Sequence, residues 1–575
     1  MYSNVKNVQL LVAMLKAKKV KNIVVSAGTS HDAIARSLEC DDYFKTYNIV
    51  DERSAAFFAL GLIQELNETV AIVCTAGTAA VNYLTGVTEA SRRNLPLVVI
   101  TADKNPYYYN QFEDQMVDQI NLFKSVVKHT VSLPMIKDDK DRWYCERLLN
   151  EAFLEINHHG TGPVHINIPI EEGMFAIGDT FTTKELPKIK VIERLDVSSD
   201  LNKWEEKFRS LKNKKVLIVY GQDYNVTQSR IEKLEKIFRN YNCLISTEKL
   251  SNLHCEGAIE MSKVSRMMTV SGEFEQICPD VVISLAGSVA WDGKFALKSN
   301  NKKFENWLVS EFGMVQDFYR NLTNIFECSI DEFLEKMSNY EIDEKNDYYN
   351  LCKNLDAKFE LPNFEYSNLY VTQKLMNNIP KDSILNLANS STIRLAQYFD
   401  NDPSIKIYCN RGIHGIDGCM STFIGQSAVT DKLSFLIIGD LTFFYDMNAL
   451  WNRYVGKNVR IMLVNNSGAA LFHFNQGLQK YPTLNENVAA DHNATAKGWT
   501  ESRGFKYLSS TNKEEFDKNL VEFVNPNSDK PIILEVFTKK EEDARLQHEF
   551  FEYNLPDSEK LKRNIKSVIK KAIGR

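Results

Sequence analysis

The sequence contains short runs of β-branched and apolar residues, each ending in a turn of small or polar residues and followed by a stretch of helical character. This alternation is typical of α/β folds, in which helices cover parallel sheets. A chain of 575 residues also has the length of about three domains of ordinary size. We therefore expect an α/β protein with parallel sheets in each of three domains. The runs form three sets: one ending at residues 163–169, one with strands at 215–221, 280–287 and 307–310, and one with strands near Ile384, Ile405, Leu436, Met462 and Ile533.

Two polar residues follow neighbouring apolar runs in the last set. Asp440 comes after residues 435–438, and Asn466 comes after residues 461–464. The carboxyl ends of parallel strands lie side by side, and such folds bind ligands there. A hard divalent cation takes oxygen ligands from one or two side chains and from phosphate groups. The pair predicts a site for Mg²⁺ and a diphosphate; the alternative is two ordinary loops.

The first set carries three turns whose order is informative. Glu52 stands in front of a helical run, Ala55 to Gln64, and is followed by the turn TAGTA at 75–79 and by TAD at 101–103. An acid at the start of a helix is often present only because it interacts favourably with the helix dipole. For an isolated Glu52 that interpretation is sufficient, so a further role depends on the two turns that follow it.

Together these motifs resemble those of thiamine diphosphate enzymes, where a glutamate precedes the same turns and a GD…NN pair binds the metal. Longer motifs narrow the resemblance to the menaquinone-pathway synthases of 2-succinyl-5-enolpyruvyl-6-hydroxy-3-cyclohexene-1-carboxylate: GDL with YDMNAL at 439–450, RGIHGIDG at 411–418, and Asn389-Ser390 with Arg394. The resemblance covers nearly the whole chain. It implies a pyrimidine-binding domain at 1–182, a middle domain at 200–340, a diphosphate-binding domain at 365–555 and a C-terminal helix at 556–575.

The resemblance also implies an activity. Enzymes of this family use thiamine diphosphate and Mg²⁺ to decarboxylate 2-oxoglutarate and to ligate the remaining fragment to isochorismate. Glu52 would hydrogen-bond the aminopyrimidine, and Ile416 would hold the cofactor bent, unless it is plain core packing. The family's site is completed across a symmetric dimer, so a homodimer or homotetramer is expected. The residues implied to bind the cofactor are Glu52, Gly77, Thr78, Ser390, Gly415, Ile416, Gly439, Asp440, Leu441, Asn466 and Gly468, of which Asp440, Asn466 and Gly468 would also bind the metal.

The substrate residues implied by the resemblance include two arginines. Arg394 and Arg411 match family arginines that bind carboxylates, a task suited to a planar guanidinium; the alternative is a surface salt bridge. His414 stands where the family has a small serine, and it is either a catalytic proton donor, a substrate contact, or a loop histidine bonded to backbone. The full substrate set is Thr29, Ser30, Lys104, Gln115, Lys294, Arg394, Arg411 and Phe472.

Three departures concern positive charge. Ser30, Lys104 and Phe295 occupy positions where the family has arginines. Losing a bidentate arginine from a carboxylate site typically costs a few kcal/mol. Three functions therefore stay open: the menaquinone-pathway synthase; a paralogous carboligase or 2-oxo acid decarboxylase with another acceptor, for example in a specialised or polysaccharide pathway; and a cofactor-binding protein without turnover. The third accounts poorly for the presence of Glu52, Asp440 and Asn466 together.

Composition excludes several other classes. The net charge is −6, which provides no electrostatic field for nucleic acid. Ten scattered cysteines, several inside apolar runs, are typical of reduced thiols in a cytoplasmic protein. No apolar run approaches the ~18 residues of a membrane span, and the first residues do not resemble a signal peptide. The basic, amphipathic segment 560–575 is expected to be a packed terminal helix, with docking on lipid as the alternative.

Overall fold

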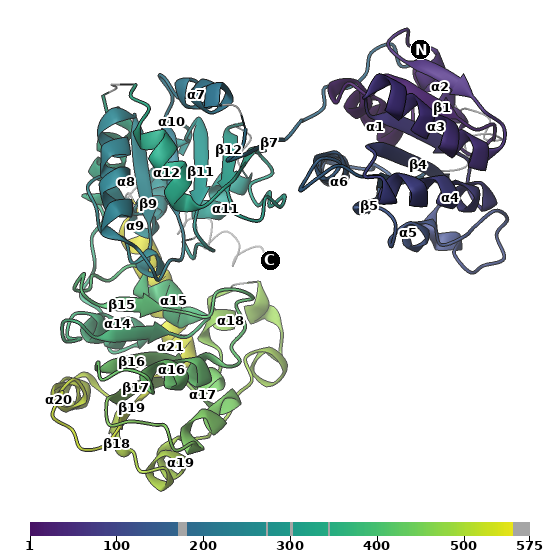
Figure 1. Cartoon of the computed structure of the whole chain (residues 1–575). Coiled ribbons are helices and arrows are strands. Elements are labelled where there is room, and N and C mark those ends of the chain that lie inside the picture. Colours follow the sequence, from purple (N-terminus) through teal and green to yellow (C-terminus); the bar gives the residue numbers. More distant parts are fainter. Residues whose placement is uncertain are drawn as a thin grey trace, which may run out of the picture. The chain divides into compact units, whose positions relative to one another are not determined.

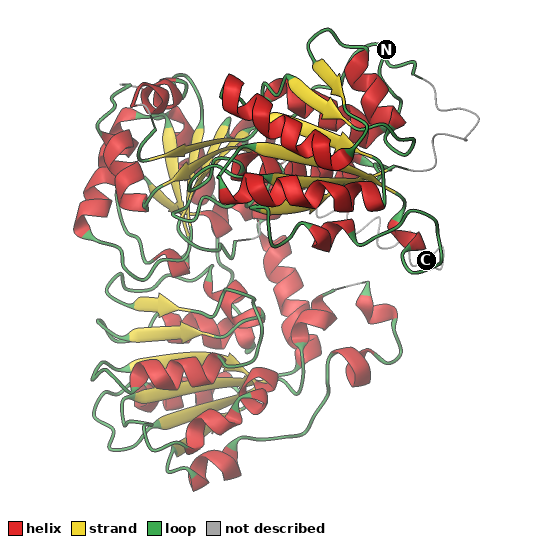
Figure 2. Cartoon of the chain, turned by 45° about the vertical axis from the view of Figure 1, so that its right-hand side comes forward, coloured by secondary structure: helices red, strands yellow, loops and turns green. Residues whose placement is uncertain are grey.

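The computed structural model describes residues 1–170, 181–199, 201–271, 274–291, 293–299, 303–342, 345–475 and 477–555. They form two compact units: Met1–Leu195 with Gly313–Ile325, and Asp196–Phe312 with the chain from Phe326 onward. Three sheets alternate with helices along the chain (Figures 1 and 2), which confirms the predicted α/β class. The predicted helix at 556–575 lies outside the described residues.

The first unit is built on a six-stranded parallel sheet of order β2-β1-β3-β4-β6-β5. Apolar side chains of α1, α2 and α6 pack on one face, and those of α3 and α4 pack on the other. The strands are β1 (Asn22–Val25), β2 (Lys45–Asn48), β3 (Val70–Cys74), β4 (Leu97–Asp103), β5 (His129–Ser132) and β6 (Val164–Pro169). The helices are α1 (Lys6–Ala17), α2 (Asp32–Glu39), α3 (Glu52–Leu66), α4 (Thr78–Arg92), η1 (Pro106–Tyr108), α5 (Gln119–Leu122) and α6 (Asp139–Glu155).

A seven-stranded sheet follows, with the order β10-β9-β8-β11-β12-β13-β7 and parallel pairing from β10 to β12. The predicted strands at 215–221, 280–287 and 307–310 correspond to β8, β11 and β12. The strands are β7 (Glu193–Asp196), β8 (Val216–Tyr220), β9 (Cys243–Thr247), β10 (Ala258–Glu260), β11 (Val281–Leu285), β12 (Glu305–Val309) and β13 (Leu322–Glu327). The helices are α7 (Leu201–Arg209), α8 (Gln228–Asn240), η2 (Lys249–Ser251), α9 (Met261–Ser271), α10 (Phe274–Ile277), α11 (Gly293–Ser299), α12 (Ile330–Ser338) and α13 (Asp347–Asp356).

The last sheet has six parallel strands in the order β15-β14-β16-β17-β19-β18. The chain passes from β14 to one neighbour and then crosses to β16 on the other side, so the strand order reverses at β14. The strands are β14 (Ile384–Leu387), β15 (Lys406–Tyr408), β16 (Ser434–Gly439), β17 (Val459–Asn465), β18 (Lys506–Ser510) and β19 (Ile532–Phe537). The helices are α14 (Asn368–Met376), α15 (Ser391–Ala396), α16 (Cys419–Ser427), α17 (Asp440–Tyr445), η3 (Met447–Trp451), α18 (Ala470–Phe474), η4 (Leu478–Lys480), η5 (Leu484–Val488), α19 (Lys497–Ser502), α20 (Lys513–Phe523) and α21 (Lys540–Tyr553).

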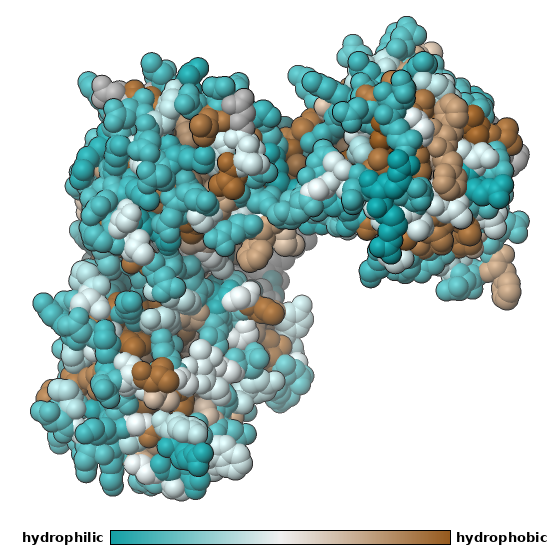
Figure 3. All heavy atoms as spheres, in the orientation of Figure 1, coloured by the Kyte–Doolittle hydropathy of each residue, from teal (hydrophilic) through white to brown (hydrophobic). Residues whose placement is uncertain are grey.

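Hydrophilic side chains predominate on the face drawn in Figure 3. All ten cysteines are free thiols, and most of them are buried, as their positions in apolar runs indicated. In the part of the chain that the structure describes, no helix combines the length and apolarity needed to cross a bilayer.

Candidate active site

The carboxylate of Asp440 is buried at the carboxyl end of the last sheet. The strands β16 and β17 are paired neighbours, with Gly439 opposite Val464, so the residues that follow them lie side by side. One oxygen of Asp440, Oδ2, accepts the backbone N–H groups of Asn466 and Gly468, each at 3.0 Å. Its other oxygen accepts the N–H of Leu441 at 2.7 Å. Burial raises the pKa of Asp440, while these N–H groups and the neighbouring His492 favour its ionised form.

Asn466 presents a free oxygen next to this carboxylate. Its side-chain nitrogen donates to Asp543 Oδ2 at 3.0 Å, which fixes the orientation of the amide. Among the described residues, its buried Oδ1 has no hydrogen-bond partner. A buried acceptor without a protein partner is costly, and an ordered water, an ion or a ligand can supply the missing partner. A carboxylate and an amide oxygen together fit a hard divalent cation such as Mg²⁺.

Gly468 completes the group that we call the cradle, formed by Asp440, Asn466 and Gly468. Its backbone has a conformation that needs glycine. Its φ is +142°, and an added Cβ would lie 2.6 Å from the carbonyl oxygen of Ala489. A side chain at this position would therefore collide with backbone, which cannot move cheaply. The turn that carries the second strand end thus depends on a glycine.

A cavity opens beside Asp440, where the strand order reverses between β14 and β16. Such crevices are the usual ligand sites of open α/β sheets. Ser390, at the start of α15, enters it with a φ of +74°. Of the residues predicted to bind cofactor or substrate, those lining the cavity are Ser390, Ile416, Gly439, Asp440, Leu441, Asn466, Gly468 and Phe472.

Asn389 organises the loop that contributes Ile416. Its side-chain nitrogen donates to the carbonyl oxygens of Asn410 and Gly415, both at 2.7 Å. Its oxygen accepts from Arg411 Nη1 at 3.2 Å. One buried amide at the end of β14 therefore holds both ends of the segment 410–415 and one guanidinium.

The predicted substrate cations of the second unit gather around His414. The side chain of Lys294 is buried, and its Nζ donates to the carbonyl oxygen of Val289 at 2.5 Å. Burial lowers the pKa of His414, and the positive charges of Arg411, Lys294 and Arg394 lower it further. His414, with a φ of +65°, is therefore a neutral imidazole at pH 7. Its Nε2 lies 3.4 Å from Ser288 Oγ.

In the first unit, Glu52 and the TAGTA turn occupy the ends of strands and starts of helices. Glu52 is the first residue of α3, partly buried, and Asn82 donates to its Oε2 at 3.4 Å. Gly77 precedes α4, which begins at Thr78, and has a φ of +85°. The N–H of Gly77 donates to Gln119 Oε1 at 2.8 Å.

The predicted substrate residues of this unit border the same turns. The Gln115 backbone would lie about 3.0 Å from a Cβ on Gly77. The N–H of Ser30 donates to Thr75 Oγ1 at 3.2 Å, and Thr29 beside it is exposed. Lys104 forms an ion pair with Glu113, with Nζ and Oε1 2.5 Å apart. The predicted residues thus form two groups, one in each unit.

Sequence reasoning overlooked several side chains that hold these groups in place. Asp543 orients Asn466, Gln119 binds Gly77, Glu113 pairs with Lys104, and Glu248 accepts the N–H of Ala290. The signal available for Glu248 was its position directly after an apolar strand, the same rule that identified Asp440. Asp543 lies inside a helix, so no comparable pattern marks it.

Comparison with known proteins agrees with this geometry. Residues 5–122 match the family described as "Thiamine pyrophosphate enzyme, N-terminal TPP binding domain". The 2-succinyl-5-enolpyruvyl-6-hydroxy-3-cyclohexene-1-carboxylate synthase of Phocaeicola vulgatus is 38% identical, with 96% of this chain and 99% of the relative aligned. The proteins of the same name from Bacteroides fragilis and Bacteroides thetaiotaomicron are each 37% identical over the same shares.

The fold, together with the family match over residues 5–122, defines a thiamine diphosphate-dependent enzyme. Within that class, similarity along nearly the full length is decisive. The chain belongs to the family of 2-succinyl-5-enolpyruvyl-6-hydroxy-3-cyclohexene-1-carboxylate synthases.

Proposed function

We propose that this enzyme decarboxylates a 2-oxo acid and joins the remaining fragment to an acceptor, with 2-oxoglutarate and isochorismate as the substrates that the family implies. The observation that carries the proposal is the Asn466 Oδ1 atom beside the buried Asp440, which no described residue hydrogen-bonds. When bound, thiamine diphosphate supplies an electron sink, which accepts the electron pair of the carbon–carbon bond that breaks as CO₂ leaves. The protein supplies binding, orientation and charge.

The cradle residues would bind the cofactor through Mg²⁺. Asp440 and Asn466 offer oxygen ligands, and the carbonyl of Gly468 is the third ligand that the family pattern assigns. Ile416 lines the cavity and is the residue that would hold the cofactor in its bent form. Glu52 would accept a hydrogen bond from N1′ of the aminopyrimidine and hold the proton there.

The cations would bind substrate carboxylates. Lys294, Arg394 and Arg411 supply positive charge, and a neutral His414 carries one ring N–H that can donate to a developing alkoxide. In the first unit, Ser30, Lys104 and Gln115 are the residues that the resemblance assigns to substrate binding. We also propose the domain limits 1–182, 200–340 and 365–555, a cytoplasmic homodimer or homotetramer, and no nucleic-acid partner, for which the net charge of −6 is the support.

A second candidate is the same chemistry with a different acceptor. The ion pair between Lys104 and Glu113 favours this candidate. Among Thr29, Ser30, Lys104 and Gln115, Lys104 is the cation that could replace a family arginine, and Glu113 already neutralises its charge. Ser30 carries no charge, and the side chain of Phe295 is exposed. A pocket with fewer available cations binds an anionic acceptor less tightly.

Release of CO₂ from a panel of 2-oxo acids, measured with and without isochorismate, tests both candidates. We expect release from at least one 2-oxo acid. Slow coupling to isochorismate would favour the second candidate, because about 1.4 kcal/mol of lost contact costs tenfold in affinity. Efficient coupling of 2-oxoglutarate at micromolar isochorismate would assign the relatives' activity, with Lys104 and Lys294 replacing the arginines. No release from any 2-oxo acid by cofactor-loaded enzyme would contradict the proposal.

A further inference from the structure

Glu248 is a buried carboxylate at the carboxyl end of β9, in the second unit. Its side chain is 4% exposed, and its Oε2 accepts the N–H of Ala290. Within the described residues, its other oxygen has no hydrogen-bond partner. A carboxylate with one uncompensated oxygen is expensive to bury, so neighbouring positive charge has to stabilise its ionised form.

The loop 288–291 connects Glu248 to the predicted substrate residues. Glu248 binds the loop through Ala290, Lys294 donates to the carbonyl oxygen of Val289, and His414 Nε2 lies 3.4 Å from Ser288 Oγ. The three contacts fall within three consecutive residues. A change at Glu248 therefore reaches Lys294 and His414 through one short segment.

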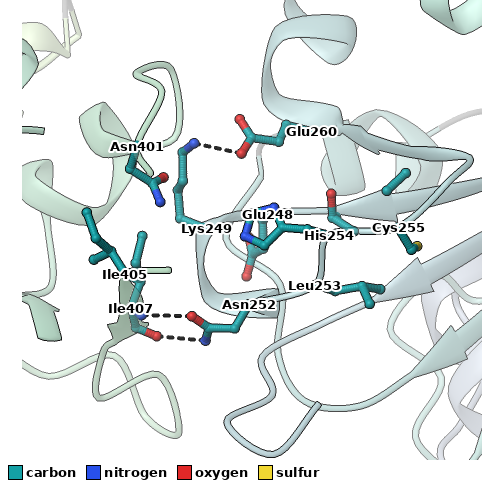
Figure 4. A pocket seen from close by; sticks show the side chains of 12 residues that line it. Glu248, Lys249, Asn252, Leu253, His254, Cys255, Glu260, Asn401, Ile405 and Ile407 are labelled. Carbon is teal, nitrogen blue, oxygen red and sulfur yellow. Dashed lines mark hydrogen bonds and ion pairs between the residues drawn. The ribbon is translucent and has the colours of Figure 1, made fainter. Parts of the chain in front are cut away.

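The turn that carries Glu248 is fixed to the strand that leads to Arg411. Asn252 donates to the carbonyl oxygen of Ile407 at 2.9 Å and accepts the N–H of Ile407 at 2.7 Å (Figure 4). Ile407 belongs to β15, which ends three residues before Arg411. Figure 4 also shows the neighbouring Lys249 paired with Glu260, so the charge of Lys249 is already balanced.

The charges that face Glu248 are those of Arg411 and Lys294. Burial raises the pKa of Glu248 to about 7, against the effect of the Ala290 N–H and of these two cations. Arg394 adds its charge to the same cluster through Arg411 and His414. Three further titratable neighbours are uncharged at neutral pH: burial raises the pKa of the Cys409 thiol to about 12 and lowers the pKa values of His414 and His254.

We propose that Glu248 is a specificity-determining residue that sets the net charge of the cluster formed by Lys294, Arg394 and Arg411. With Glu248 ionised, three cations and one carboxylate leave two positive charges, which match a dianionic acid. Protonation or neutralisation of Glu248 adds a third positive charge and favours more highly charged anions. The inference rests on the proposed function, which gives the identity of the substrates. It concerns only how the cluster distinguishes acids that carry different numbers of negative charges.

The test is a calorimetric titration of the enzyme loaded with thiamine diphosphate and Mg²⁺. Glutarate serves as an unreactive dianion, and butyrate as a monoanion of similar length. One added positive charge attracts both carboxylates of glutarate but only the single carboxylate of butyrate. Glu248→Gln should therefore raise the ratio of glutarate affinity to butyrate affinity by roughly tenfold at pH 8. In the wild type the ratio should rise as the pH falls through about 7, because Glu248 takes up a proton there. In Glu248→Gln the ratio should not depend on pH.

Two variants separate charge from packing. Glu248→Asp keeps the charge and should retain the wild-type ratio at pH 8, even if the loop shifts. Glu256→Gln removes an exposed carboxylate that pairs with Arg239 at the surface, and it should leave the ratio unchanged. An unchanged ratio in Glu248→Gln, or no glutarate binding to any variant, would overturn the inference. Decarboxylation of 2-oxo acids is measured in a separate assay. If no 2-oxo acid is decarboxylated but the affinity ratio still changes in Glu248→Gln, then the proposed function fails and this inference stands.

Discussion

At the scale of single residues, Asp440 is the side chain on which the cofactor site depends. It offers the carboxylate of the proposed metal set, and three backbone N–H groups hold it in place. Asp440→Ala should abolish Mg²⁺-dependent binding of thiamine diphosphate, measured by calorimetry, while circular dichroism shows an intact fold. Asp517→Asn, on α20 against the Tyr370 hydroxyl, is the control and should bind normally. Wild-type affinity in Asp440→Ala would remove the metal assignment.

Asp543 acts on the same site through Asn466. Removing its carboxylate in Asp543→Ala frees the Asn466 amide to rotate, so the oxygen would no longer be held toward the metal. Substitutions of groups that orient metal ligands typically weaken metal affinity about 10- to 100-fold. A Mg²⁺ titration of cofactor binding measures this loss. Thr538→Val removes the other side-chain donor to the same Asp543 oxygen and should have a smaller effect; equal affinities in Asp543→Ala and wild type would contradict the orienting role.

The sequence could predict Asp440 and Asn466 because both follow apolar strands, where a polar residue is conspicuous. For Glu248 the same signal was present but was masked by the lysine that follows it, and for Asp543 it was absent. Asp543 is buried within α21 and meets Asn466 only through tertiary packing. Glu248 precedes a lysine, and a charged pair after a strand has the pattern of a solvated loop. Burial, which distinguishes these two carboxylates from surface acids, is not visible in local sequence.

At the scale of elements, the TAGTA turn depends on the backbone conformation of Gly77. Its positive φ strains any residue with a side chain, and the Gln115 carbonyl oxygen, 3.0 Å from an added Cβ, would also have to shift. Gly77→Ala should destabilise the protein by about 1–3 kcal/mol and weaken cofactor binding. Chemical denaturation and calorimetry measure the two effects. Gly61→Ala is the matched control, since it lies within α3 with nothing within 4 Å and should be neutral or stabilising. Similar losses in both variants would refute the conformational argument.

The predicted strands of the last set are all present, because each is an apolar run with a defined end. The edge strand β18 (Lys506–Ser510) was not predicted, since its partly exposed, mostly polar residues lack such a run. The helix after Glu52 begins earlier than the predicted Ala55. Asp51 caps it by accepting the N–H of Ser54, so Glu52 is already helical. Strand ends that carry function were therefore easier to predict than helix starts.

At the scale of the whole molecule, the two groups of predicted residues lie in different units of the chain. In the resembled family each site combines the first domain of one subunit with the third domain of another. Mixed Glu52→Gln and Asp440→Ala subunits, each inactive alone, should therefore recover part of the activity. In a heterodimer one site carries both lesions and the other carries neither. Absence of rescue, once mass spectrometry has verified subunit exchange, would place complete sites within single chains.

The cradle around Asp440 has a consequence for how such an enzyme evolves. Its carboxylate is held by backbone N–H groups, which most substitutions at Leu441 or Asn466 leave in place. The charges that we propose to select substrates belong instead to side chains, which a single codon change can remove or invert. A lineage can therefore exchange one acceptor for another in small steps while the inherited cofactor machinery survives.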